Sequence, residues 1–140
     1  MGIRQLSVFL ENKKGSLHEI TDILAKAGVD LRSMCIADTS DYGVVRIITK
    51  DPERAQEVLR REGHTASVRT INAFAVPDEP GGLAKVLSLL ESRGVNIEYL
   101  YALITTCTDK AYTVMRTDDT EVADSILRSN GVELLSEKNI

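Results

Sequence analysis

Tryptophan is absent from this chain of 140 residues, and aromatic residues make up only 4% of it. Side-chain platforms on which nucleic-acid bases stack are therefore not expected. Positive charge is scarce as well, because the formal net charge is −4 and no run of basic residues is longer than a pair. A protein that tracks phosphate groups needs a basic surface, so nucleic acid is not an expected partner.

Long apolar segments are also missing. None approaches the roughly 20 residues that span a bilayer, and the first residues carry neither the apolar core nor the cleavage site of a signal peptide. Cysteine occurs only twice, at Cys35 and Cys107, and the two form no C-x-x-C pair. These features predict a cytoplasmic protein without a membrane partner, whose two thiols are reduced and packed as small strand residues.

Motifs for catalysis and metal binding are missing too. His18 and His64 show no metal-ligand spacing with each other or with a cysteine. The chain has no glycine-rich phosphate loop and no recognisable pairing of a nucleophile with a base. We therefore expect no cofactor, no metal and no catalytic residue, and an enzyme is the least favoured class.

The chain does contain an internal repeat. The segment 12–17 (NKKGSL) corresponds to 78–83 (DEPGGL), and 27–31 (AGVDL) corresponds to 93–97 (RGVNI), both at a spacing of 66 residues. A constant spacing across two separate landmarks predicts two copies of one supersecondary unit. Later landmarks correspond at 68 residues, which places two extra residues at a hairpin tip of the second copy, where an insertion costs little.

Each copy shows the same order of hydrophobic periodicities and helix-ending signals. The first copy predicts strands at 3–10, 29–37, 42–49 and 67–70, with helices at 17–27 and 51–62. The second predicts strands at 71–76, 97–106, 111–116 and 132–135, with helices at 83–93 and 119–130. The order β-α-β-β-α-β with right-handed crossovers gives a four-stranded antiparallel sheet with both helices on one face. We therefore predict an α+β fold of two ferredoxin-like units, with domains at 1–70 and 71–140.

The repeated motifs resemble those of an ACT domain. In that family the first strand ends in [Asn/Asp]-x-Pro-Gly-x-Leu and the first helix ends in Gly-Val-[Asn/Asp]-Ile. The second copy fits through 78–83 and 94–97, whereas the first copy departs at Lys14, where proline is usual. The resemblance covers essentially the whole chain. It implies a stand-alone tandem ACT protein that senses a small molecule, most often an amino acid, at an interface between two such domains.

The segments that precede the first helix of each copy have the chemistry of an amino-acid site. The first amides of a helix lack an acceptor inside it, and together with the helix dipole they favour a carboxylate. Glycine lets a ligand approach the backbone, and a carboxamide or carboxylate can accept from an ammonium group. Ser16 adds a hydroxyl that can also cap its helix. The candidate residues are Asn12, Gly15, Ser16, Leu17, Asp78, Gly81, Gly82 and Leu83.

The resemblance adds candidates from the neighbouring domain, because in side-by-side ACT pairs each such segment faces the neighbour's first helix and second strand. These added candidates are Leu31, Asn96 and Ile97. Asp30, Met34 and Leu100 are lower-ranked candidates. Tyr99 and Tyr101 alternate along one strand and should share a face. They either pack between chains or form one wall of a ligand site.

Plainer interpretations remain open for the same residues. Asn, Asp, Gly and Ser are also the residues that an ordinary strand-to-helix turn requires. Leu17 and Leu83 are equally suited to anchor the core beside a pocket. The first functional hypothesis is a regulatory protein that binds an amino acid and shifts an oligomer or partner equilibrium, as a homodimer by default. The alternative is a regulatory or structural subunit that binds a metabolic enzyme and has no ligand of its own.

Overall fold

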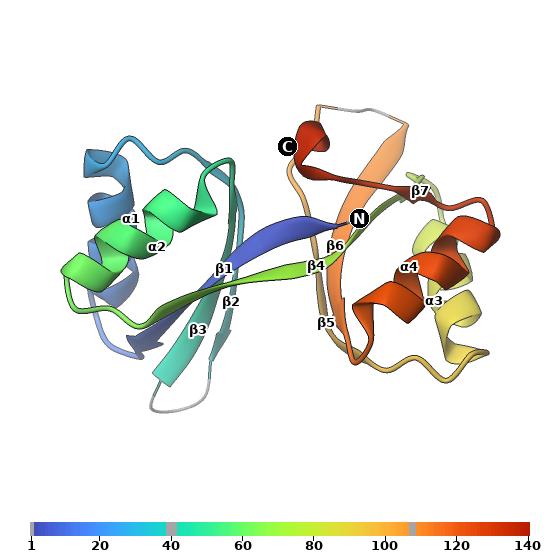
Figure 1. Cartoon of the computed structure of the whole chain (residues 1–140), viewed down its shortest axis with the longest axis horizontal. Coiled ribbons are helices and arrows are strands. Elements are labelled where there is room, and N and C mark those ends of the chain that lie inside the picture. The colour runs from blue at the N-terminus through green and yellow to red at the C-terminus, as the bar shows by residue number, and fades with distance from the viewer. Residues whose placement is uncertain (1, 39–41, 107–108) are drawn as a thin grey trace. The chain divides into compact units, whose positions relative to one another are not determined.

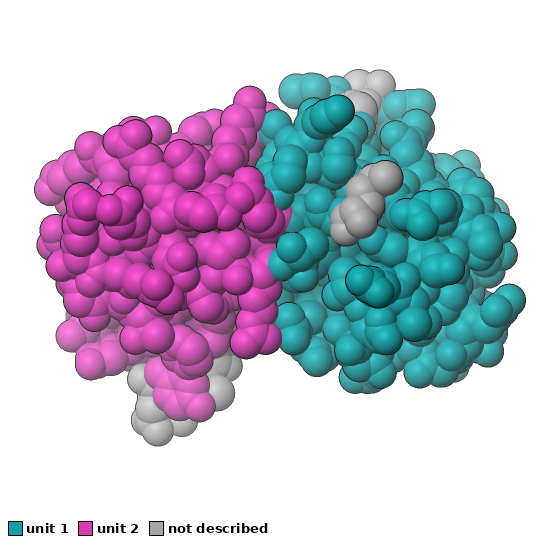
Figure 2. Space-filling view, viewed as in Figure 1, with its two compact units in different colours: residues 1–3, 70–140 teal, residues 4–69 magenta. Residues whose placement is uncertain are grey.

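The computed structural model describes residues 2–38, 42–106 and 109–140. The chain divides into two compact units (Figure 2): unit 2 is Arg4–Arg69, the first copy of the repeat, and unit 1 is Met1–Ile3 with Thr70–Ile140, the second copy. Both are α+β units with the predicted β-α-β-β-α-β order. Cys107, Thr108 and residues 39–41, which the sequence places at strand ends and hairpin turns, lie outside the described residues.

Unit 2 contains a sheet whose strands are ordered β2-β3-β1-β4, with only the first residues of β4 in this unit. Its elements are β1 Ile3–Glu11, α1 Ser16–Lys26, β2 Leu31–Asp38, β3 Tyr42–Thr49, α2 Pro52–Arg61 and β4 Ala66–Pro77. The strand pairs β1/β3 and β2/β3 are antiparallel. Figure 1 shows α1 and α2 together beside this sheet, and their apolar faces supply Ile20, Leu24, Ala55 and Leu59 to a buried core.

Unit 1 repeats the arrangement with the order β7-β4-β6-β5. Its further elements are α3 Gly82–Glu91, β5 Ile97–Ala102, β6 Lys110–Thr117, α4 Thr120–Ser129, β7 Glu133–Leu134 and the 3₁₀ turn Glu137–Asn139. Both helices again lie together beside the strands (Figure 1), and the core is built around Phe74, Leu90, Met115 and Leu127. The edge strand β7 is only two residues long.

The helix that follows the β-hairpin of each unit starts where the sequence predicts it. Asp51 caps α2 by accepting a hydrogen bond of 3.1 Å from the amide of Arg54, and Pro52 opens that helix. Asp119 caps α4 by accepting one of 3.0 Å from the amide of Val122. A carboxylate at this position satisfies an amide that has no acceptor inside the helix.

Two strand predictions are wrong in their bounds. The strands expected at 67–70 and 71–76 form the single strand β4, because no glycine, proline or other turn residue separates them. The strand expected at 97–106 ends at Ala102, and Leu103 makes one more backbone hydrogen bond to Tyr112 before the chain leaves the sheet. Among the described residues, no helix is long and apolar enough to cross a membrane.

Candidate functional site

The segments 12–17 and 78–83, here called the first and second corners, have matching backbones. Gly15 has φ 84° and ψ −10°, and Gly81 has φ 85° and ψ −6°. This left-handed conformation is strained for residues with a Cβ atom and easy for glycine. Because both corners need glycine at the same place, the repeat in the sequence reflects a repeat in backbone geometry.

The hydrogen bonds inside the two corners also match. In the first corner, the amide of Lys13 donates to the carbonyl of Glu11 (3.0 Å), and the amide of Ser16 donates to the carbonyl of Lys13 (3.3 Å). In the second corner, the amide of Glu79 donates to the carbonyl of Pro77 (2.9 Å), and the amide of Gly82 donates to the carbonyl of Glu79 (3.1 Å). Each corner is therefore closed by hydrogen bonds of its own backbone.

The starts of α1 and α3 carry no capping side chain among the described residues; Gly15 and Gly81 occupy the capping positions. Ser16 is the first helical residue and not the cap, so the capping role that the sequence suggested for its hydroxyl is wrong. Its side chain is buried. Free amides at the positive end of the helix dipole suit a carboxylate or another small anion.

The first corner borders a cavity of about 270 Å³ inside unit 2. Three predicted residues, Asn12, Ser16 and Leu17, line it. Ile36 of β2 and Gly43 of β3 line the same cavity, and sequence reasoning missed both. Their signal was the pairing of the hairpin strands, in which Ile36 lies opposite Val45, on the face of the sheet that α1 covers.

The second corner exposes and buries its predicted residues as the first corner does. Asp78 and Gly81 are exposed, and the amide of Asp78 donates a hydrogen bond of 2.9 Å to the carbonyl of Asp109. Leu83 packs against the core of unit 1. Gly82 is buried and lines a cavity of about 490 Å³ inside the same unit.

Leu31 lies at the far end of unit 2 from the first corner. It pairs with Thr49 at the end of β3, whereas Glu11, the residue that leads into the corner, pairs with Tyr42 at the start of β3. A single copy of unit 2 therefore does not bring Leu31 to Asn12.

Asn96 and Ile97 show the same separation in unit 1. Ile97 pairs with Thr117 at the end of β6, whereas Pro77, which leads into the second corner, pairs with Lys110 at the start of β6. A site that joins a corner to these residues needs a second unit.

The structure also places the histidine, tyrosine and cysteine side chains that the sequence singled out. Within the described ranges, no group of three or more His, Cys, Asp and Glu residues could hold a metal ion. Nε2 of His64 lies 3.4 Å from Oε1 of Glu19, without hydrogen-bond geometry. Tyr99 and Tyr101 share a face as predicted, with ring centroids 6.4 Å apart and planes at 24°. Cys35 is half-buried on β2.

Comparison with known proteins identifies the family. A family model described as an ACT domain pair matches residues 1–140. The chain belongs to the ACT domain pair family. No curated protein matches this ACT domain pair.

Solved structures resemble this ACT domain pair over nearly its whole length. Protein BT0572 from Bacteroides thetaiotaomicron is 36% identical, with a TM-score of 0.91 over 99% of this chain and 95% of that one. The regulatory subunits of aspartate kinase from Thermus thermophilus and Thermus flavus share the fold, at 16% and 20% identity and TM-scores of 0.68 and 0.66. The alignment with the first subunit covers 94% of this chain and 94% of the subunit. The alignment with the second covers 92% of this chain and 90% of the subunit.

Proposed function

We propose that this ACT domain pair is a regulatory protein that binds a small molecule, an amino acid, at its strand-to-helix corners. The observation that supports this most is the pair of uncapped helix starts, α1 and α3, held by corners of identical backbone geometry. A helix start without a capping side chain keeps its amides available to an external carboxylate.

The corners have room for such a ligand next to the backbone. A Cβ atom added at Gly15 or at Gly81 would meet no other atom within 4 Å. The ligand's carboxylate would accept from the amides of the helix start. Its ammonium group would donate to Asn12 or Asp78, the polar residue that opens each corner. This combination of donors and acceptors selects an α-amino acid over a simple anion.

A second unit would complete each site by supplying Leu31, or Asn96 and Ile97, to the corner. Domains 1–70 and 71–140 would then be the two binding modules, and a homodimer is the simplest assembly that pairs them. A ligand that completes its site only in the paired arrangement stabilises that arrangement, typically by about 1–3 kcal/mol. We further propose that the protein acts in the cytoplasm and catalyses no reaction itself.

The experiment uses the full chain and measures its melting temperature with each common amino acid at millimolar concentration. A ligand at 100 times its dissociation constant stabilises the folded state by about 2.7 kcal/mol. His18 and Ala84 are the exposed third residues of α1 and α3. The variants His18→Asp and Ala84→Asp place a carboxylate at the helix start, which favours the helix but repels the ligand's carboxylate.

The matched controls are His18→Asn and Ala84→Asn, which add a similar side chain without the charge. We expect the amino-acid-dependent rise in melting temperature to disappear in the Asp variants and to persist in the Asn variants. If no amino acid raises the melting temperature of the unmodified chain, or if the Asp variants respond as well as the Asn variants, the corners are not amino-acid sites.

The second candidate function is a regulatory subunit that binds a metabolic enzyme without a ligand of its own. It is favoured by the fold shared with two regulatory subunits of aspartate kinase. Co-purification of one enzyme in fixed stoichiometry, whose activity changes with this subunit but not with added amino acids, would support this candidate over the first.

A further inference from the structure

Both units contain a cavity at the same place, distinct from the 270 Å³ cavity. It lies between the end of the strand before the corner, the first turn of the following helix, and the loop after the second helix. The cavity measures about 340 Å³ in unit 2 and about 490 Å³ in unit 1. Every residue that lines the smaller cavity has its repeat counterpart, 66 or 68 positions later, in the lining of the larger one.

The two cavities differ in their side chains, and unit 2 carries the larger residue at most of these places. Phe9 stands where unit 1 has Ala75, and His64 stands where unit 1 has Val132. Ser16 stands where unit 1 has Gly82. The cavity of unit 1 is the larger of the two, and its volume is within the range of about 300–1,000 Å³ typical of small-molecule sites.

The cavity of unit 1 has an apolar interior. Val86 is only 4% exposed, and Leu89 and Val132 are half-buried beside it. These three side chains come from α3 and from the loop after α4, so they form walls that face one space. Burying an aliphatic or aromatic group against them removes apolar surface from water.

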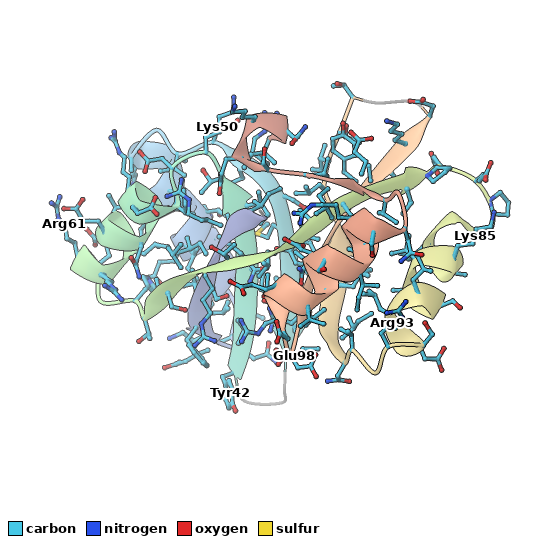
Figure 3. All side chains as sticks on the ribbon, turned by 45° about the vertical axis from the view of Figure 1, so that its right-hand side comes forward. Tyr42, Lys50, Arg61, Lys85, Arg93 and Glu98 are labelled. Atoms are coloured by element: carbon cyan, nitrogen blue, oxygen red, sulfur yellow. The ribbon has the colours of Figure 1, made fainter. Side chains whose placement is uncertain are left out.

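Charges stand at the mouth of this cavity. The ammonium group of Lys110 already forms an ion pair, because its Nζ lies 2.5 Å from Oε2 of Glu133. The side-chain ammonium of Lys85, on the first turn of α3 (Figure 3), has no ion-pair or hydrogen-bond partner among the residues that the structure describes. The exposed carboxylates of Glu79 and Asp109 also line the cavity. A free cation at a helix start, with carboxylates across the mouth, suits a zwitterion.

Unit 2 lacks this arrangement. Glu19 stands where unit 1 has Lys85, so a negative charge replaces the positive one, and His64 lies against it. A ligand's carboxylate would be repelled there. The difference between the two copies indicates that one cavity per chain is suited to the ligand.

We propose that the cavity of unit 1 binds an amino acid with a large apolar side chain. Lys85 pairs with the carboxylate beside the start of α3, and Val86, Leu89 and Val132 surround the side chain. This inference rests on the proposed function, and it names the class of amino acid that the second corner selects. All the residues that line this cavity belong to unit 1, and the second unit of the proposed function would add to the same corner.

The test measures dissociation constants by calorimetry on the full chain, with leucine, phenylalanine, serine and aspartate as probes. We expect leucine or phenylalanine to bind and the two polar amino acids to bind at least about tenfold more weakly, since they leave the apolar walls unfilled. Lys85→Met should weaken binding about tenfold or more, because it removes a charge-assisted contact. The control Lys50→Met removes an exposed lysine outside the described cavities and should bind normally.

A second pair of variants tests the cavity itself. Val132→His introduces the residue that unit 2 carries and should abolish binding by filling the space, whereas His64→Val changes only the cavity of unit 2 and should leave the dissociation constant unchanged. Circular dichroism checks that each variant is folded. Two results would overturn the inference while leaving the proposed function intact. In the first, amino acids bind without a preference for apolar side chains. In the second, neither Lys85→Met nor Val132→His alters the dissociation constant. Absence of any binding would refute both.

Discussion

Asn72 of β4 donates a hydrogen bond of 2.7 Å from its Nδ2 to Oδ1 of Asp124 in α4, and both side chains are buried. Asn72 also donates to the carbonyl of Thr120 at 2.9 Å and accepts from the hydroxyl of Thr117 at 2.9 Å. The corresponding residues of unit 2 are Leu6 and Gln56, and there Gln56 of α2 instead donates a hydrogen bond of 3.0 Å to the carbonyl of Ala66 in β4.

Replacing one partner of this link should destabilise unit 1 strongly. Asn72→Leu leaves the carboxylate of Asp124 buried without its amide donor, which we expect to cost about 3 kcal/mol. The double variant Asn72→Leu, Asp124→Gln copies the residues of unit 2 and should recover more than half of that loss. Urea denaturation of the single and double variants measures the coupling. Additive losses would mean that the two side chains are energetically independent.

The sequence was sufficient to predict the order of elements and the corners, because these depend on local chemistry. Aspartate caps a helix that follows it, as Asp51 and Asp119 do. Glycine is favoured where the backbone is left-handed, as it is at Gly15 and Gly81. The same local reasoning failed for β4. No turn residue lies between its two expected halves, and whether such a segment bends or continues depends on the strands beside it.

The candidate site was less accessible to sequence reasoning, because it depends on register and on side-chain volume. The far position of Leu31 follows from its pairing with Thr49, which no local pattern encodes. The larger cavity of unit 1 is lined by residues from separate places in the chain. Only a comparison of the two copies with the structure shows that Ala75 and Val132 stand where unit 2 has Phe9 and His64.

Lys14 is the position at which the first corner departs from the second, which has Pro80. Gly15 and Gly81 have nearly the same backbone angles, the two corners have corresponding hydrogen bonds, and those of the first corner use the amides of Lys13 and Ser16. Lys14→Pro should therefore fit without losing a bond and stabilise the protein by about 0.5 kcal/mol, by restricting the unfolded chain. Urea denaturation measures this change, and Pro80→Lys should lower stability by a similar amount. A destabilised Lys14→Pro variant would show that the two corners differ in backbone conformation.

Gly82 and Ser16 are equivalent positions, but exchanging their residues should destabilise the protein by unequal amounts. A Cβ atom at Gly82 would lie 2.4 Å from the carbonyl oxygen of Pro77, so Gly82→Ser forces the second corner to move. We expect a loss of about 1–3 kcal/mol in the free energy of unfolding. Ser16→Gly adds flexibility at a helix start and should cost less, about 0.5 kcal/mol. Equal effects in thermal melts of the two variants would contradict the close approach at Pro77.

The ion pair of Lys110 and Glu133 should make stability depend on alkaline pH. The hydrogen bond to Glu133 raises the pKa of Lys110 above its usual value of 10.5. Because the folded state holds this proton more tightly, the contribution of the pair is fully present below pH 10.5 and is lost as the pH rises through the folded-state pKa. Glu133→Gln should thus lower stability slightly at neutral pH and converge with the unmodified chain at high pH. Glu121→Gln, an exposed change on α4, is the control, and a difference for Glu133→Gln that persists unchanged above pH 10.5 would show that the pair does not act through the charge of Lys110.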